Sequence, residues 1–137
     1  MSVTQRIKNM AARIPHPNAV VRDSNHTEEE SAREVTIINF WRFNEMVEKE
    51  GLIYYLDEGY YIEVQQLKCL LEPATQQPLI DLRRILLEIT NSEHDFDSDD
   101  WLYDELFMDY LQELEDRFLL FNVEELCQAL IDFVGPK

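Results

Sequence analysis

The chain has 137 residues, and its 28 acidic and 12 basic side chains give a formal net charge of −16 at pH 7. This length suits one domain with a sizeable core, and an apolar fraction of 45% is ordinary for a globular protein. The charge argues against direct binding to nucleic acid or to an anionic membrane, because both require cationic side chains. A basic protein partner, or simple solubility, remains.

The sequence lacks the marks of several other classes. Its three glycines cannot build a phosphate-binding or dinucleotide-binding loop, and no apolar run approaches the roughly 20 residues of a membrane span. The N-terminus has no apolar segment typical of a secretory signal, so we expect a cytoplasmic protein. Cys69 and Cys127 stand in apolar helical patterns and are predicted to be reduced, mostly buried thiols.

The N-terminal segment has the opposite charge to the rest. Residues 1–22 carry four basic and no acidic side chains, whereas residues 23–137 carry 28 acidic and 8 basic ones, a net charge of −20. A helical stripe begins the chain, formed by Val3, Ile7, Met10 and Ile14. We predict that 1–27 forms a basic helix or arm with a linker, and that 28–137 forms an acidic helical domain. The arm would dock on acidic surface of its own chain or of a second copy, which leaves a homodimer open.

The middle of the chain is predicted to be helical. A capping box at Thr27 and Glu30 begins a helix that runs to about Glu50 and is ended by Gly51. An aromatic stretch with a short helix and a turn follows, then a helix over 61–71 and one capped by Thr75. The aromatic side chains of this region are predicted to be core: Phe40, Trp41, Phe43, Tyr54, Tyr55, Tyr60 and Tyr61.

The C-terminal part has the clearest helical period. Ser98 is predicted to cap a helix that has Asp99 and Asp100 in its first turn, and Asn122 with Glu125 caps the last helix. The apolar stripe of the first of these helices is Tyr103, Leu106, Phe107, Tyr110, Leu111, Leu114 and Phe118. Since no hairpin signal occurs, the fold class is predicted to be all-α, a single compact domain of about six helices.

Catalytic and metal-binding patterns are absent from the sequence. The three histidines, His16, His26 and His94, fall in predicted loops without catalytic or ligand spacing, so we interpret them as solvated and expect no enzyme and no cofactor. Asp95, Asp97 and Asp99 resemble the start of a calcium loop, but Asp100 and Leu106 stand where glycine and glutamate are required. No metal site is therefore predicted, and these carboxylates either cap a helix or bind a partner.

Residues 93–116 hold 11 acidic side chains and no Lys or Arg. At about 100° per residue, Glu105, Asp109, Glu113 and Asp116 lie together, opposite the apolar stripe. Each like-charged pair at i, i+4 costs roughly 0.2–0.5 kcal/mol. Trp101 and Met108 lie beside the acids; Trp101 either belongs to a binding surface or packs on another element. The predicted partner-binding residues are Asp95, Asp97, Asp99, Asp100, Trp101, Glu105, Met108, Asp109, Glu113 and Asp116.

Residues 40–135 resemble a family of small acidic helical proteins from bacteria that are related to a DNA-mimic protein. The family has a glycine turn, an aromatic pair and a second glycine, and here Gly51, Tyr54, Tyr55 and Gly59 stand in those places. Leu114, Asp116 and Phe118 fit a Leu-Asp-x-x-Phe segment of the family. This chain departs from the family in having one glycine rather than two at 51, and Leu71-Glu72-Pro73 in place of a small turn.

The resemblance implies a helical, non-enzymatic, intracellular protein that displays carboxylates in place of DNA phosphates. The family is also associated with immunity proteins of toxin pairs. Charge and resemblance together lead to the expectation of an inhibitor whose acidic face occupies the basic, nucleic-acid-binding surface of a partner protein. The alternative is an immunity protein that neutralises a cognate bacterial toxin.

Overall fold

The computed structural model describes residues 2–13, 28–92 and 94–135. In the helix over 28–50, it describes side chains from residue 32 onward. These residues form α-helices and one short 3-10 helix and contain no strand, so the all-α prediction is confirmed. The elements are α1 (Val3–Arg13), α3 (Glu28–Glu50), α4 (Leu52–Asp57), α5 (Tyr61–Leu70), α6 (Gln77–Thr90), η1 (Asp100–Tyr103), α7 (Glu105–Leu119) and α8 (Val123–Val134). Thr27, Ile14, His16 and His26 lie outside the described residues.

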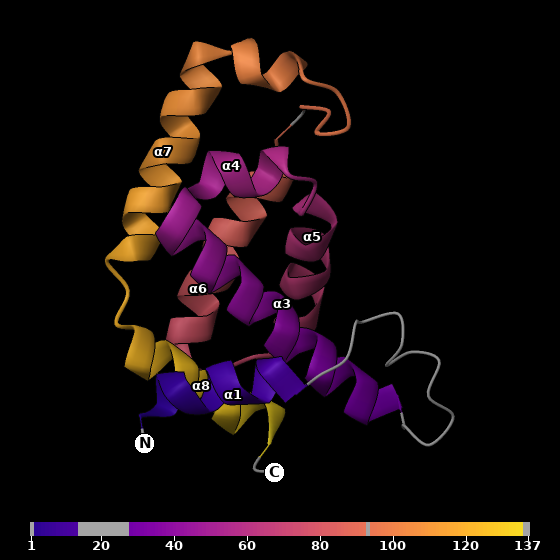
Figure 1. The fold of residues 1–137 in the computed structure, drawn as a ribbon, viewed down its shortest axis with the longest axis vertical. Coiled ribbons are helices and arrows are strands. Elements are labelled where there is room, and N and C mark those ends of the chain that lie inside the picture. Colours follow the sequence, from indigo (N-terminus) through magenta and orange to yellow (C-terminus); the bar gives the residue numbers. More distant parts are fainter. Residues whose placement is uncertain (1, 14–27, 93, 136–137) are drawn as a thin grey trace.

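The long helix α3 crosses the middle of the molecule and packs against α1, α4, α5 and α8 (Figure 1). Helix α6 lies behind it and contacts α5, α7 and α8. Figure 1 shows η1 and the start of α7 at one end of the molecule and α1 with α8 at the other. The acidic segment before α7 is therefore far from the basic N-terminal helix.

Helix α1, which lies in the segment predicted to form a basic helix or arm, packs against the body of the protein. It contacts α8 and α3, and the Ile7 side chain is completely buried in the common core. The carboxylate of Glu124 on α8 accepts the backbone N–H of Val3 at 3.1 Å. Of the apolar stripe expected from the sequence, Ile7 is buried and Val3 and Met10 are partly buried against the core.

Gly51 ends α3, as predicted, and it also allows α7 to approach. Its φ of +97° is a conformation that only glycine adopts readily. A Cβ at this position would lie 2.9 Å from Oε1 of Glu115 on α7. The same Oε1 accepts the backbone N–H of Leu52 at 2.6 Å, in the first turn of α4. One α7 carboxylate therefore ties this helix to the α3–α4 junction.

Two predicted helix caps are wrong and one is confirmed. Helix α6 begins after Gln76 with Pro78 in its first turn, so Thr75 does not cap it. Helix α7 begins at Glu105 and is capped by Asp104, whose side chain accepts the N–H of Phe107, so Ser98 does not cap it. At α8, the side-chain oxygen of Asn122 accepts the N–H of Glu125 at 3.2 Å, as expected.

The two cysteines have opposite environments. Cys127 is buried, and its burial raises the pKa of the thiol to about 11. Cys69 is exposed, contrary to expectation. The buried face of α5 carries Val64 and Leu67, and Cys69 is two residues from Leu67, about 200° around the helix. Of the predicted aromatic core, Tyr54 is likewise exposed, whereas Phe40, Phe43 and Tyr55 are buried.

Candidate functional site

The solvent side of α7 carries a stripe of carboxylates. Glu105, Asp109, Glu113 and Asp116 are all exposed, as the periodicity predicted, and they lie within about 80° of one another around the helix axis. Asp116 accepts a hydrogen bond from the Gln112 amide at 3.1 Å. None of the four forms an ion pair with a basic side chain in the described part of the chain.

The segment before α7 extends this charge toward the end of the molecule. Asp95, Asp97, Asp99 and Asp100 are exposed in the loop and at the start of η1. Oδ1 of Asp95 accepts the backbone N–H of Asp97 at 2.9 Å, which orders the turn. We call these eight carboxylates, three on the loop, one at the start of η1 and four on α7, the acidic face. Within residues 2–13, 28–92 and 94–135, no three His, Cys, Asp or Glu side chains are placed to hold a metal ion.

Trp101 is not part of the surface. Only 2% of the side chain is exposed, and its ring packs against Phe96 at 5.0 Å and Phe107 at 6.2 Å between centroids. The alternative that Trp101 packs on the loop or on another helix is therefore the correct one. Met108 is half-buried against the core and contributes only an edge to the surface. Trp101 instead anchors the loop that carries the acidic face.

Two other apolar side chains, rather than Trp101, are exposed near the carboxylates. Tyr103 is 84% exposed and Leu106 is 82% exposed, although both were predicted to be core. Because α7 begins only at Glu105, Tyr103 belongs to η1, and the buried stripe of α7 is the narrower set Phe107, Leu111, Leu114 and Phe118. These four residues follow the spacing i, i+4, i+7, i+11 of one helix face. Leu106 does not fit this spacing, and this sequence pattern could have excluded it from the core.

His94 anchors the loop, so its interpretation as a solvated histidine is wrong. Its ring stacks on Phe107 at 3.9 Å with an interplanar angle of 7°, and its Nε2 lies 2.9 Å from Oδ2 of Asp104. Ser92 Oγ lies 2.8 Å from the other ring nitrogen. The hydrogen bond from His94, followed by that from the Phe107 N–H, lowers the pKa of Asp104. This carboxyl therefore caps α7 and holds the loop at the same time.

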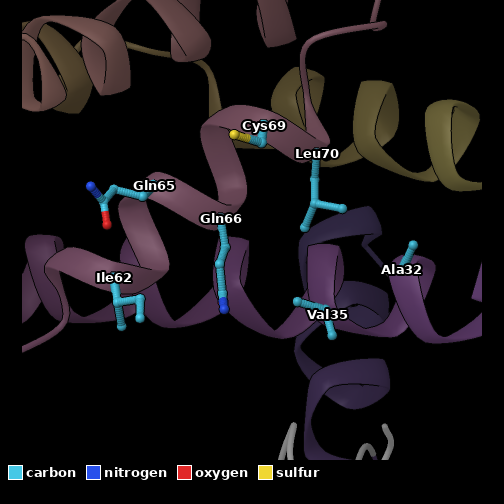
Figure 2. Close-up of a pocket in the computed structure, with 7 residues that line it drawn as sticks. All are labelled: Ala32, Val35, Ile62, Gln65, Gln66, Cys69 and Leu70. Carbon is cyan, nitrogen blue, oxygen red and sulfur yellow. The ribbon is translucent and has the colours of Figure 1, made fainter.

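A second open region lies between α3 and α5 and has a different character. It is a groove of about 590 Å³ lined by Ala32, Val35, Ile62, Gln65, Gln66, Cys69 and Leu70 (Figure 2). Figure 2 shows aliphatic side chains from both helices along it, and Ile62 is 61% exposed. None of the described residues that line this groove is a carboxylate, so its described lining is largely apolar, whereas the acidic face is charged.

The chain matches no protein-family model, and neither curated proteins nor solved structures match it. The resemblance to DNA-mimic proteins therefore stays a hypothesis. None of the described helices combines the length and the apolar character that crossing a membrane requires.

Proposed function

We propose that this protein binds, through its acidic face, a basic nucleic-acid-binding surface of a partner protein and thereby blocks it. The observation that carries the proposal is a set of eight exposed carboxylates that form no ion pair with a basic side chain of the described residues, beside the exposed side chains of Tyr103 and Leu106. The carboxylates would steer a cationic partner, and the apolar pair would supply the desolvated contact that slows dissociation.

The spacing of the carboxylates limits how far the face imitates DNA. Successive carboxylates at i, i+4 on α7 are separated by about 6 Å of helix rise. One strand of B-DNA has a phosphate about every 3.4 Å of rise, so the stripe has roughly half that linear charge density. Charge alone would therefore select poorly among basic surfaces, and Tyr103 and Leu106 are the groups that add selectivity.

The test is a pair of double charge reversals with the same change in net charge. Glu105→Lys with Asp109→Lys removes the centre of the acidic face, whereas Glu72→Lys with Asp132→Lys changes exposed acids outside it. Each tagged variant and the wild type captures proteins from a lysate of the source cell at low salt. The captured proteins are identified, and the affinity of each is measured at two salt concentrations.

We expect a basic nucleic-acid-binding protein that is lost with the first pair, retained with the second, and displaced by duplex DNA. If the two pairs capture alike, net charge alone explains the binding and the proposal fails. An immunity protein would be one form of the same proposal, in which the basic surface belongs to a nuclease toxin. The identity of the captured protein separates these two roles.

A further inference from the structure

A pocket opens between the end of α6 and the start of α7. Its volume is about 410 Å³, and it is lined by Glu88, Asn91, Ser92, His94, Phe107 and Tyr110. The stacked rings of His94 and Phe107 and the ring of Tyr110 give it aromatic walls, whereas α6 contributes oxygen acceptors. Among the described residues that line the pocket, Glu88 is the carboxylate and none is a Lys or Arg.

This combination matches the chemistry of a guanidinium group. Arginine is planar, stacks on aromatic rings and donates several N–H bonds in a fixed geometry to carboxylate and carbonyl oxygens. Lysine carries a strongly hydrated point charge, which gains less from flat aromatic walls. Tyr110 and Glu88 line the same pocket, and partial burial, followed by the charge of the Glu88 carboxylate, raises the pKa of Tyr110.

The pocket borders the acidic face along α7. Leu106, Tyr110 and Glu113 are spaced by four and three residues, so they follow one another along the same side of the helix. Tyr110 lines the pocket, while Leu106 and Glu113 are exposed on the surface next to it. A partner chain lying on the acidic face could therefore reach the pocket with one long side chain.

Arg117 of the protein itself already forms an ion pair with Glu88, the carboxylate of this pocket. Its Nη1 lies 2.9 Å from Oε2 of Glu88, and both side chains are partly exposed. An exposed pair of this kind contributes about 0–1 kcal/mol, so an incoming guanidinium can replace it. The internal contact shows that Glu88 is placed to accept a guanidinium.

We propose that the pocket between α6 and α7 receives an arginine side chain of the basic partner, with Glu88 as its carboxylate and Tyr110, His94 and Phe107 as its walls. The proposal rests on the function proposed above, because the arginine arrives on a partner that the acidic face binds. It makes Arg117 an internal competitor for the same carboxylate.

The experiment uses fluorescently labelled octa-arginine and octa-lysine peptides, which carry the same charge, with the full chain. Glu88→Gln should weaken octa-arginine binding about tenfold, as expected for a lost charged hydrogen bond, and change octa-lysine binding little. Arg117→Gln should tighten octa-arginine binding by up to about fivefold. The matched controls Glu72→Gln and Arg84→Gln change the net charge identically and should have smaller, peptide-independent effects.

The outcomes separate this proposal from the one on which it rests. If Glu88→Gln and Glu72→Gln affect both peptides equally, and Arg117→Gln behaves like Arg84→Gln, the arginine pocket is refuted. The acidic face stands in that case as long as Glu105→Lys with Asp109→Lys weakens both peptides more than its matched control does. If that pair has no effect beyond its control, the proposed function itself fails.

Discussion

The acidic face and the α3–α5 region are both open to solvent, but they differ in what their polar groups bind. Between α3 and α5, Arg42 pairs with Glu63 at 2.9 Å, and the Asn39 amide donates to Gln66 at 3.1 Å. The Arg42 guanidinium also lies over the Tyr60 ring at 5.2 Å. On the acidic face, no carboxylate is neutralised by a described basic side chain. Polar groups in the first region hold two helices together, whereas the carboxylates of the acidic face form no such ion pair within the described residues.

Helix α7 carries, within three residues, one carboxylate that binds another part of the chain and one that is exposed on the acidic face. Glu115 is half-buried and accepts the Leu52 N–H, and Glu113 is exposed on the acidic face. Since the residues are chemically identical, position alone decides which one stabilises the fold. The predictions below compare matched positions of this kind.

The largest effect should come from the buried side of α7. Leu111 is completely buried, so Leu111→Ala should lower the free energy of unfolding by about 2–5 kcal/mol through lost burial and a cavity. Leu106→Ala, the same substitution on the exposed side, should change it by no more than about 0.5 kcal/mol. Urea unfolding of both variants measures the difference. Equal losses would mean that Leu106 is packed rather than available to a partner.

The next effect concerns the paired and unpaired carboxylates of α7. Glu115→Ala removes the acceptor of the Leu52 N–H and should cost about 1–3 kcal/mol. Glu113→Ala should leave stability unchanged within about 0.5 kcal/mol, because it removes an exposed charge with like-charged neighbours. Chemical denaturation compares the two. A destabilised Glu113→Ala protein would show that the acidic face contributes to folding.

A smaller, pH-dependent effect is expected between α3 and α5. Burial raises the pKa of Glu63, and the Arg42 guanidinium opposes this rise. When the pKa of a carboxyl group is higher in the folded than in the unfolded state, the free energy of unfolding decreases as the pH rises through the folded pKa. Arg42→Met should raise that pKa further, so the variant should lose more stability at pH 7 than at about pH 4, near the ordinary glutamate pKa.

Unfolding measurements at the two pH values test this effect. Adding Glu63→Gln to Arg42→Met should remove the extra pH dependence. A loss that is the same at both pH values would instead assign the role of Arg42 to packing and to its contact with the Tyr60 ring.

The smallest expected effect is a difference in reactivity between the two cysteine thiols, one in the groove and one in the core. Cys69 lines the open α3–α5 groove, whereas Cys127 is buried with its thiol pKa raised to about 11. Because the thiolate is the reactive form, one thiol per native chain should react rapidly with Ellman's reagent at pH 8. Cys69→Ser should abolish this fast phase without changing the melting temperature. Two fast thiols would mean that α8 opens readily.

The start of α7 shows where local sequence signals compete. Ser98 and Asp104 both accept backbone N–H groups well, and each precedes an apolar period. The choice depends on partners distant in the chain: Phe96 stacks on Tyr61 of α5, and His94 holds Asp104. These contacts fix the loop, so the cap lies at Asp104 and the register of the exposed residues follows from it.

The sequence by itself determined the all-α class, the end of α3 at Gly51, the cap at Asn122 and the exposure of the four α7 carboxylates of the acidic face. These features depend on backbone conformation, on local hydrogen bonds and on the 3.6-residue period, which act within a few residues. Tertiary structure decided that Trp101 is buried, that Tyr103 and Cys69 are exposed, and that α1 joins the core. A period defines the faces of a helix, but only the packing of distant elements decides which apolar side chains those elements cover.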